Sequence, residues 1–361
     1  MAPDPVTVAI IGTGLIGPRH AQTVLEDPNT ILTAIVDPLP HGEQIAQRFN
    51  VPWHKSISSL IASTDKPLAA IICTPNHTHV PIALDLVSAG IHVLVEKPIS
   101  VDISSGETLI CAARNKGVNL LVGHHRRFNP YVVAAKEVIY SGRLGAITAV
   151  NGMWTTYKPP SYFDPPGDWR RDGVKGGVVM INLIHDVDLL QALAGPITRV
   201  YAEGTPKRRG FDAEEGAAIT FRFESGAVGS FLLCDNVPSP HNFEAGTGEN
   251  PLLPKVGKDF YRIFGTEGML SVPDLTVWSY GVQKSWQEVM RMETADVDEG
   301  IVPFKAQLTH FVKVVRRGEE PQCSGEMGLA ALKVCEAVKE SLRTGMPVRI
   351  SRRSVVENSA I

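Results

Sequence analysis

Cysteine is scarce in this 361-residue sequence and never occurs as a closely spaced pair. The five cysteines are scattered along the chain, at Cys73, Cys111, Cys234, Cys323 and Cys335. Structural zinc sites typically use C-x-x-C pairs, and disulfide frameworks use an even number of cysteines. We therefore expect neither a disulfide framework nor a metal site, and we expect these residues to be small buried hydrophobes.

Long apolar runs are also missing. A helix that crosses a membrane needs roughly 20 consecutive apolar residues, and no run approaches that length. The segment from Met1 to Pro5 lacks the basic start and apolar core of a signal peptide. The sequence therefore predicts a cytoplasmic protein that does not bind a membrane.

The chain has no excess of positive charge. Its formal net charge is −3, from 35 Lys and Arg against 38 Asp and Glu. A protein that binds nucleic acid through the phosphates needs a basic surface that releases counterions, and no stripe of Lys and Arg provides one. The composition, with 43% hydrophobic and 20% charged residues, is that of an ordinary globular protein. A small molecule is the better candidate ligand.

The first forty residues carry the clearest pattern in the chain. An apolar, β-branched strand from Thr7 to Ile11 leads into the glycine-rich turn Gly12 to Gly17. A helix follows, and then a second apolar strand, Ile31 to Val36, ends in Asp37. This order of strand, glycine turn, helix, strand and acid is typical of half a dinucleotide-binding site.

Each glycine of the turn has a physical reason. Gly12 allows the tight exit from the strand, Gly14 lets a pyrophosphate approach the backbone, and Gly17 lets the helix lie close to the sheet. The N-terminus of the helix then offers unpaired N–H groups and a partial positive charge to the phosphates. A glycine turn also occurs for packing alone, so the prediction depends on the surrounding pattern. The turn residues predicted to bind the cofactor are Gly12, Thr13, Gly14, Leu15, Ile16 and Gly17.

Asp37 favours NAD over NADP. Its carboxylate can accept hydrogen bonds from both ribose hydroxyls of NAD, whereas a 2′-phosphate would meet it as a like charge. The residues that follow, Pro38-Leu39-Pro40, supply no arginine to offset that repulsion. Taken alone, Asp37 could also be a solvated carboxylate at a strand end.

After Asp37, helices and strands continue to alternate, which predicts a doubly wound parallel sheet of the Rossmann type. Ligands bind such sheets beyond the carboxyl ends of the strands. Three polar segments follow predicted strands, at Thr74 to His79, Glu96 to Pro98 and His124 to Arg127. We therefore expect them to line one crevice with the glycine turn, and Thr74, Pro75, Asn76, His79, Glu96 and Lys97 to contribute to cofactor binding.

The second part of the chain has a different pattern. Strands with alternating or apolar character are expected at 146–154, 198–203, 217–223, 227–233 and 260–264. Helices are expected at 131–140, 180–193, 304–316 and 328–343, and loops at 158–176 and 236–258. The length exceeds that of one usual core. We predict a Rossmann domain at 1–127 and an α+β domain at 128–361 with a mainly antiparallel open sheet.

These motifs together resemble the Gfo/Idh/MocA oxidoreductases, a family that includes glucose-fructose oxidoreductase and inositol dehydrogenases. The resemblance covers nearly the whole chain and is specific in combination, although no single motif would be. It rests on the following residues: Gly12-x-Gly14-x-x-Gly17-x-x-His20, Thr74-Pro75-Asn76-x-x-His79, Glu96-Lys97-Pro98, Arg127-Phe128-x-Pro130, Trp169-Arg170, Gly176-Gly177 and His185-x-x-Asp188.

The resemblance implies that Lys97 and His185 are the catalytic residues. In the family this lysine exchanges a proton with the substrate hydroxyl or carbonyl, and the histidine often acts as its partner. A residue before proline is pushed towards extended geometry, and partial desolvation reduces the preference of a lysine for its charged form. From the sequence alone, Lys97 could be a surface lysine and His185 a capping or core histidine.

The chain departs from the family pattern at one position. Inositol dehydrogenase-like members carry an aspartate four residues before the histidine, where this chain has Ile181. Isoleucine cannot transfer a proton or orient an imidazole. Asn182 follows, but a helix turns successive side chains about 100° apart, so it is not a simple substitute. The change puts a polyol substrate and the usual proton relay in doubt.

The resemblance also places residues on the substrate side. An arginine can hold hydroxyls or a carboxylate, and a tryptophan can pack on a sugar face. A structural role for this loop is equally compatible with the sequence, and His79 could cap the next helix. The residues expected to contact substrate are His125, Trp169, Arg170, Asn182 and His185.

Three functions follow as hypotheses. The first is NAD(P)-dependent oxidoreduction of a secondary hydroxyl of a sugar, cyclitol or related polyol. The second uses tightly bound NAD in a redox-neutral hydrolysis, elimination or epimerisation, and the third is nucleotide binding without catalysis. The open sheet exposes a face that relatives cover by pairing subunits, so a homodimer or homotetramer is expected.

Overall fold

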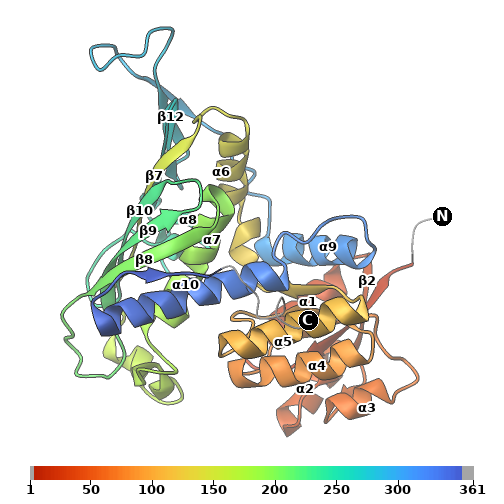
Figure 1. Ribbon diagram of the computed structural model, residues 1–361. Coiled ribbons are helices and arrows are strands. Elements are labelled where there is room, and N and C mark those ends of the chain that lie inside the picture. Colours follow the sequence, from red (N-terminus) through yellow and green to blue (C-terminus); the bar gives the residue numbers. More distant parts are fainter. Residues whose placement is uncertain (1–3, 352–361) are drawn as a thin grey trace, which may run out of the picture. The chain divides into compact units, whose positions relative to one another are not determined.

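The computed structural model describes residues 4–351 (Figure 1), and within that range the chain forms two compact units. Unit 1 contains the described residues up to Phe128 together with Ile301–Leu332. Unit 2 contains Asn129–Gly300 and the described residues from Lys333 onward. The first division lies one residue beyond the expected boundary at 127. The segment 301–332, expected in the second domain, instead belongs to unit 1.

Unit 1 is built on a sheet in which every pair of strands is parallel. The strand order is β3-β2-β1-β4-β5-β6, the order of doubly wound dinucleotide-binding folds. Its middle strands are buried on both faces, which explains their continuous apolar runs. The described strands are β1 (Val6–Ile11), β2 (Thr30–Val36), β3 (Trp53–His54), β4 (Ala69–Ile72), β5 (His92–Val95) and β6 (Leu120–Val122).

The crossovers of unit 1 are helices whose ends follow local sequence signals. Asp102 caps one helix by accepting a hydrogen bond from the Ser105 amide, and Gly117 ends the same helix in the left-handed conformation. The helices are α1 (Gly17–Glu26), α2 (Pro40–Phe49), α3 (Ile57–Ile61), α4 (His79–Ser88) and α5 (Ile103–Lys116). The late helix α9 (Pro303–Val315) packs against α1 and buries Leu308, Phe311 and Val312 in the core of unit 1.

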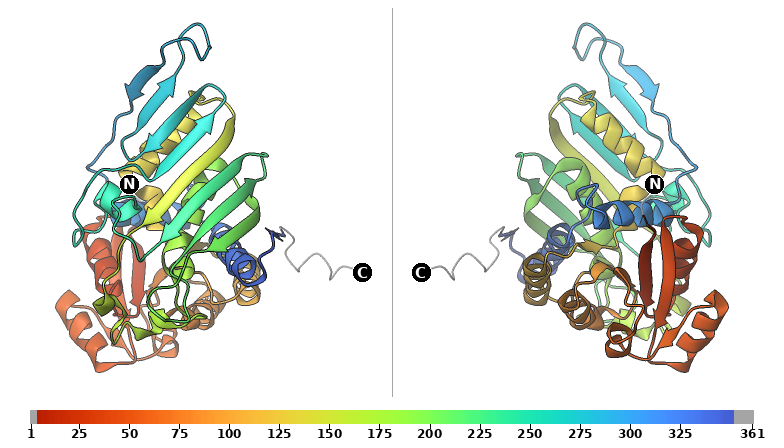
Figure 2. Two further views of the ribbon diagram at one scale, coloured as in Figure 1. Left: turned by 90° about the vertical axis from the view of Figure 1, so that its left-hand side faces the viewer. Right: turned by 90° about the vertical axis from the view of Figure 1, so that its right-hand side faces the viewer.

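Unit 2 contains a nine-stranded mixed sheet in the order β14-β13-β12-β11-β7-β10-β9-β8-β15 (Figure 2). The pair β10 and β7 is parallel, and the other pairs are antiparallel. The described strands are β7 (Ile147–Thr155), β8 (Ile197–Gly204), β9 (Gly216–Phe223), β10 (Val228–Cys234), β11 (Tyr261–Gly265), β12 (Gly268–Val272), β13 (Thr276–Ser279), β14 (Arg291–Thr294) and β15 (Val348–Arg349).

The helices of unit 2 pack on one face of this sheet. They are α6 (Pro130–Tyr140), α7 (Ile184–Ala194), α8 (Phe243–Thr247) and most of α10 (Gly325–Thr344). The single helix expected at 180–193 begins instead as a π-helical turn, Val179–Leu183, which continues into α7. The expected loop 236–258 contains α8, and the expected loop 158–176 contains two short 3₁₀ turns. None of the described helices is long and apolar enough to span a membrane.

Candidate active site

The glycine turn after β1 has the close contacts that its sequence predicts. Gly12 has φ +92°, and a Cβ there would lie 2.8 Å from the Thr74 side chain. A Cβ on Gly17 would lie 2.0 Å from the carbonyl oxygen of Gly12, which is far inside van der Waals contact. The turn and the start of α1 can pack together only because both positions lack side chains.

The outer side of the turn is open. A Cβ on Gly14 would meet nothing within 4 Å, and Leu15 is fully exposed. Ile16, the N-cap of α1, makes no side-chain capping bond, so the first N–H groups of the helix have no side-chain acceptor there. An exposed glycine backbone beside an uncapped helix N-terminus fits the pyrophosphate of a dinucleotide.

Asp37 lies at the carboxyl end of β2 and faces the same turn. The Thr13 amide and hydroxyl donate to Asp37 Oδ2 at 2.8 and 2.7 Å, and the Leu39 amide donates to Oδ1 at 2.9 Å. These contacts bring the carboxylate beside the glycine turn. A carboxylate oxygen accepts more than one hydrogen bond, so Oδ1 keeps capacity for a ribose hydroxyl.

His79 joins the segments that follow β4 and β5. Its Nδ1 lies 2.8 Å from the Pro98 carbonyl oxygen, and its Nε2 lies 2.8 Å from the Thr74 carbonyl oxygen. The ring is almost fully buried, and burial lowers its pKa, against the two carbonyl contacts that favour the protonated ring. His79, predicted as a cofactor residue, thus also connects the cofactor segment at Thr74 to the residue after Lys97.

Glu96 is held by a buried histidine. Its Oε1 lies 2.8 Å from His20 Nε2, and a Cβ on Gly123 would come within 2.9 Å of the same carboxylate. Burial alone would raise the pKa of Glu96, but the hydrogen bond with His20 and the charges of His20, His125 and Lys97 lower it overall. Lys97 follows at the end of β5 and is half-buried, before a cis peptide bond to Pro98.

Phe304 of α9 packs against the histidines near this strand end. The His125 ring stacks on it at 4.5 Å between centroids, and the His20 ring meets it edge-on at 5.1 Å. The Arg19 guanidinium lies 3.9 Å from the centre of the same ring. His125 therefore packs on a residue almost 180 positions later, a contact that sequence patterns do not reveal.

Unit 2 holds the other predicted catalytic residue. His185 lies in the first turn of α7 and is 7% exposed. Its neighbour Asp186 is fully buried and accepts a hydrogen bond from the Tyr261 hydroxyl at 2.5 Å. Asn182 lies three residues before His185, in the π-helical turn. Such turns occur often at functional sites because they redirect the side chains that follow.

Sequence reasoning missed a buried charged cluster beside Asn182. Lys158, at the end of the segment that follows β7, donates to Asn182 Oδ1 at 2.6 Å and pairs with Asp235 at 3.3 Å. Asp235 also pairs with Arg209 at 2.6 Å. We name Lys158, Asn182, Asp235 and Arg209 the Lys158 cluster. A lysine placed directly before two prolines was the available signal, but its partners are 24 and 77 residues away.

The predicted Trp169-Arg170 pair lies in a short 3₁₀ turn, Asp168–Arg171. Trp169 is 43% exposed, and the Arg170 guanidinium lies over the rings of Tyr162 and Trp169 at 4.3 and 5.1 Å. Arg170 lines a narrow cavity together with Lys158, Ile181 and Arg209. The structure thus brings Arg170 and the Lys158 cluster to one place.

Comparisons with known proteins agree with this architecture. Residues 6–124 match the oxidoreductase family NAD-binding Rossmann fold, and residues 136–350 match the C-terminal α/β domain of the same family. The chain belongs to the Gfo/Idh/MocA oxidoreductase family. The resemblance and the fold class expected from the sequence are therefore confirmed.

Several known proteins align over almost the whole chain. An inositol 2-dehydrogenase from Rhizobium meliloti is 31% identical, over 96% of this chain and 99% of its own. The scyllo-inositol 2-dehydrogenase (NAD(+)) of Bacillus subtilis is 26% identical, over 96% of both chains. The WlbA dehydrogenase from Bordetella pertussis, solved with NADH and UDP-GlcNAcA, superposes with TM-score 0.77 at 23% identity, covering 97% and 100% of the two chains. The chain is thus an oxidoreductase with an NAD-binding domain.

Proposed function

We propose that this protein is an NAD-dependent dehydrogenase that oxidises or forms a secondary alcohol of a sugar, cyclitol or related polyhydroxy compound. The observation that carries the proposal is the placement of Lys97 just after the carboxyl end of β5. The open glycine turn follows the carboxyl end of β1, a strand of the same parallel sheet. Ligands of doubly wound sheets bind at these strand ends. Bound NAD supplies the hydride acceptor or donor at its nicotinamide ring.

Lys97 is the proposed proton-transfer group. In the oxidation direction, its neutral amine takes the proton of the substrate hydroxyl while the carbinol carbon loses hydride, which leaves a carbonyl and an ammonium. In reduction, the ammonium returns that proton to the forming alkoxide. His79 and the His20–Glu96 pair support this role, because they hold the residues on both sides of Lys97.

His185 is the second proposed catalytic residue. It supplies an imidazole, which can accept a proton from the substrate hydroxyl or donate one to it. Asp186 and Tyr261 support it by fixing the first turn of α7. The substrate residues proposed alongside it are His125, Trp169, Arg170 and Asn182.

We propose NAD rather than NADP as the physiological cofactor. The support is the anionic Asp37 carboxylate, held beside the glycine turn by Thr13 and Leu39. A 2′-phosphate at this position would add a like charge, and the next three residues provide no cation to balance it.

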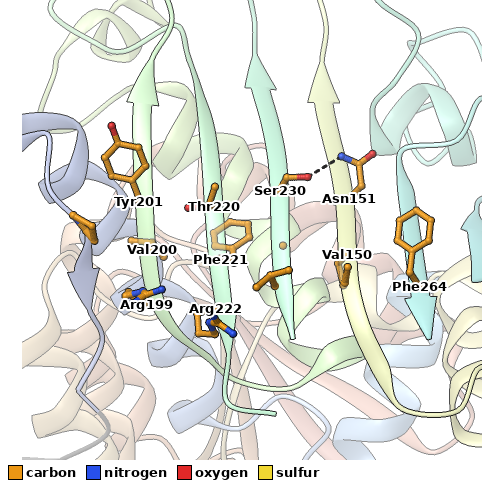
Figure 3. Close-up of a pocket in the computed structure, with 14 residues that line it drawn as sticks. Val150, Asn151, Arg199, Val200, Tyr201, Thr220, Phe221, Arg222, Ser230 and Phe264 are labelled. Carbon is orange, nitrogen blue, oxygen red and sulfur yellow. Dashed lines mark hydrogen bonds between the residues drawn. The ribbon is translucent and has the colours of Figure 1, made fainter. Parts of the chain in front are cut away.

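We also propose that the open face of the second sheet pairs with a second copy of the chain. One row of that face runs through Tyr201, Thr220, Ser230 and Asn151 on adjacent strands (Figure 3), and Asn151 donates to Ser230 at 3.1 Å. In the next row Arg199 lies directly opposite Arg222. Two like charges opposite each other are unfavourable unless a carboxylate balances them. Glu203 lies on the same face of β8, so Glu203 of a second copy is a candidate for that carboxylate.

The activity is tested by a substrate screen. Purified protein is mixed with sugars, cyclitols and sugar acids, with NAD and separately with NADP, and absorbance of the reduced cofactor is followed at 340 nm, the usual wavelength for it. We expect reduction of NAD by at least one polyhydroxy compound, at higher kcat/KM than with NADP. Tight NADH binding with no turnover across the whole panel would contradict the proposal.

A further inference from the structure

The first turn of α1 carries an arginine that no described carboxylate neutralises. Arg19 follows Gly17 by two residues, and its side chain is exposed. Its guanidinium lies over the Phe304 ring, 3.9 Å from the ring centre. Within the described residues 4–351, Arg19 forms no ion pair and its side chain donates no hydrogen bond. The proposed roles of Lys97 and His185 give this positive charge no function.

Helix α9 lies beside α1 and contacts its two ends in different ways (Figure 1). At the last turn of α1, Lys305 of α9 pairs with Glu26 at 2.8 Å. At the first turn, α9 instead presents the apolar ring of Phe304 to Arg19. The two helices are thus matched by opposite charges at one end, and a positive charge is left unbalanced at the end that borders the glycine turn.

The ring contact leaves the hydrogen-bonding capacity of Arg19 intact. A guanidinium has five N–H donors, and a ring face attracts the cation without accepting those bonds as a carboxylate would. Arginine can therefore stack on an aromatic ring and bind a phosphate with the same group. The carboxylates of this site have other partners, since Asp37 accepts from the glycine turn and Glu96 contacts His20.

Phe304 is buried at the carboxyl edge of the parallel sheet. His125, which follows β6, stacks on the ring, and His20 meets it edge-on. His20 in turn contacts Glu96, which follows β5. The ring therefore holds Arg19 at the edge where the glycine turn after β1 is open. Helical side chains lean towards the N-terminus of their helix, so Arg19 leans towards that turn.

We infer that Arg19, held over Phe304, binds the diphosphate of the dinucleotide cofactor. In doubly wound folds the diphosphate lies at the N-terminus of the helix that follows the glycine turn. Arg19 adds a full positive charge to the partial charge of that N-terminus. Phe304 is a positioning residue, so the late helix α9 contributes to cofactor affinity. This inference rests on the proposed dehydrogenase function, because it extends the cofactor site of that activity.

Cofactor binding by single variants tests this assignment. The purified protein is titrated with NADH by fluorescence, and ADP-ribose and adenosine are titrated as competitors. Arg19→Met should weaken binding of NADH and ADP-ribose about ten-fold or more, because both contain the diphosphate, and should leave adenosine within about two-fold. Arg19→Lys should keep part of the affinity, because it keeps the charge. The control Arg48→Met removes an exposed arginine that lies over Phe49 in the last turn of α2, and should leave all three affinities unchanged.

A double-mutant cycle tests the role of the ring. Phe304→Leu should weaken NADH binding, and Arg19→Met should cost less affinity in that variant than in the original protein, because the arginine is no longer held at the diphosphate. Phe304→Tyr keeps a ring and should keep most of the affinity. Added NaCl should weaken NADH binding by the original protein more than by Arg19→Met, because salt screens an exposed charge. Thermal unfolding shows which variants are folded.

The outcomes separate this inference from the proposed function. Unchanged NADH affinity in folded Arg19→Met, or an equal loss of adenosine affinity, overturns the inference. Additive effects of the two substitutions overturn the positioning role of Phe304. Unchanged NADH affinity in Arg19→Met alongside normal turnover would overturn the inference and leave the dehydrogenase function intact. Weakened NADH and ADP-ribose binding in Arg19→Met, with no compound oxidised by the original protein, would do the reverse.

Discussion

At the residue scale, the Asp37 carboxylate accepts three hydrogen bonds, two from Thr13 and one from Leu39, and it lies beside the open glycine turn. Replacing Asp37 by Ala removes the acceptor proposed for the ribose hydroxyls. Loss of a hydrogen bond to a charged group costs about 1.5–3 kcal/mol, so we expect NADH affinity to fall at least about ten-fold. NADPH affinity should fall less or rise, since the repelling charge is also gone. Fluorescence titration of both cofactors measures this, and an equal loss for the two would contradict the assignment of Asp37.

His79 makes the stability of unit 1 sensitive to acid. Its pKa is lowered from 6.5 by burial, so the unfolded chain binds the proton more readily than the folded chain does. Stability is therefore expected to fall as the pH drops below about 6.5, through the window between the two pKa values. In His79→Gln this part of the acid sensitivity should disappear, at a cost of about 1 kcal/mol at pH 7.5 for the altered contacts. Urea unfolding at pH 7.5 and 5.5 tests this, and identical pH dependence in both proteins would contradict it.

Lys158 is expected to reduce stability rather than add to it. Burial lowers its pKa from 10.5 to about 8, although Asp235 acts in the opposite direction. Below pH 8 the folded protein carries a buried charge whose cost is on the order of 3 kcal/mol, and stability should rise as the pH increases from 8 towards 10.5. Lys158→Met should therefore be at least as stable as the original protein at pH 7, with Arg209 still balancing Asp235. A loss of several kcal/mol in urea unfolding at pH 7 would show that Lys158 is a structural residue instead.

Residue roles were predictable where they depend on neighbours in sequence. The backbone requirements of Gly12 and Gly17 follow from the strand-turn-helix pattern, and the structure shows the close contacts. Lys158 was not predictable, because it is defined by Asp235, a partner 77 residues later. Long-range pairs of this kind leave no periodic signal in one sequence.

At the element scale, Gly17 and Gly14 of the glycine turn have different roles, one in packing and one in cofactor binding. Replacing each by Ala tests the two roles separately. A Cβ at Gly17 would lie 2.0 Å from the Gly12 carbonyl, so Gly17→Ala must shift α1 and should lose about 1–3 kcal/mol or more of stability. A Cβ at Gly14 meets nothing, so Gly14→Ala should keep its stability while NADH binding weakens, because the methyl group stands where a pyrophosphate would approach. Thermal unfolding and NADH titration of both variants check this. Equal stability of the two would contradict the packing account.

Long periodic elements were predicted well and short ones were not. The strands β1 and β2 each begin one residue before their expected starts at Thr7 and Ile31, because continuous apolar runs mark them, whereas the two-residue strand β3 was not expected. The strands β12, β13 and β14 were missed, since each has only four or five residues and little alternation. The π-helical turn at Val179–Leu183 was also missed, because its spacing differs from an α-helix over only five residues.

At the scale of the whole molecule, the division into units was only partly predictable. The change of pattern near residue 128 marks the first boundary. The return of Ile301–Leu332 to unit 1 depends on α9 packing its apolar face against a core formed 300 residues earlier. Amphipathic periodicity predicts that such a helix is buried, but it does not say against which core.

We expect the pairing of two copies through the open face of the second sheet to depend on the charges of that face. Arg199→Glu combined with Arg222→Glu reverses the charge of neighbouring positions on that face, and should convert an oligomer into a monomer in light scattering after size exclusion. The control Lys116→Glu changes an exposed residue of α5 and should leave the mass unchanged. A monomeric original protein at micromolar concentration, or an unchanged mass in the double variant, would contradict pairing through this face.

The central claim is that Lys97 moves the substrate proton beside bound NAD. The measurement that tests it most directly compares kcat and NADH affinity for Lys97→Ala and for the exposed control Lys116→Ala, with the best compound from the screen. We expect Lys97→Ala to bind NADH within about two-fold of the original protein and to lose roughly 10²–10⁴-fold in kcat, while the control keeps both values. Unchanged kcat in Lys97→Ala would contradict the account.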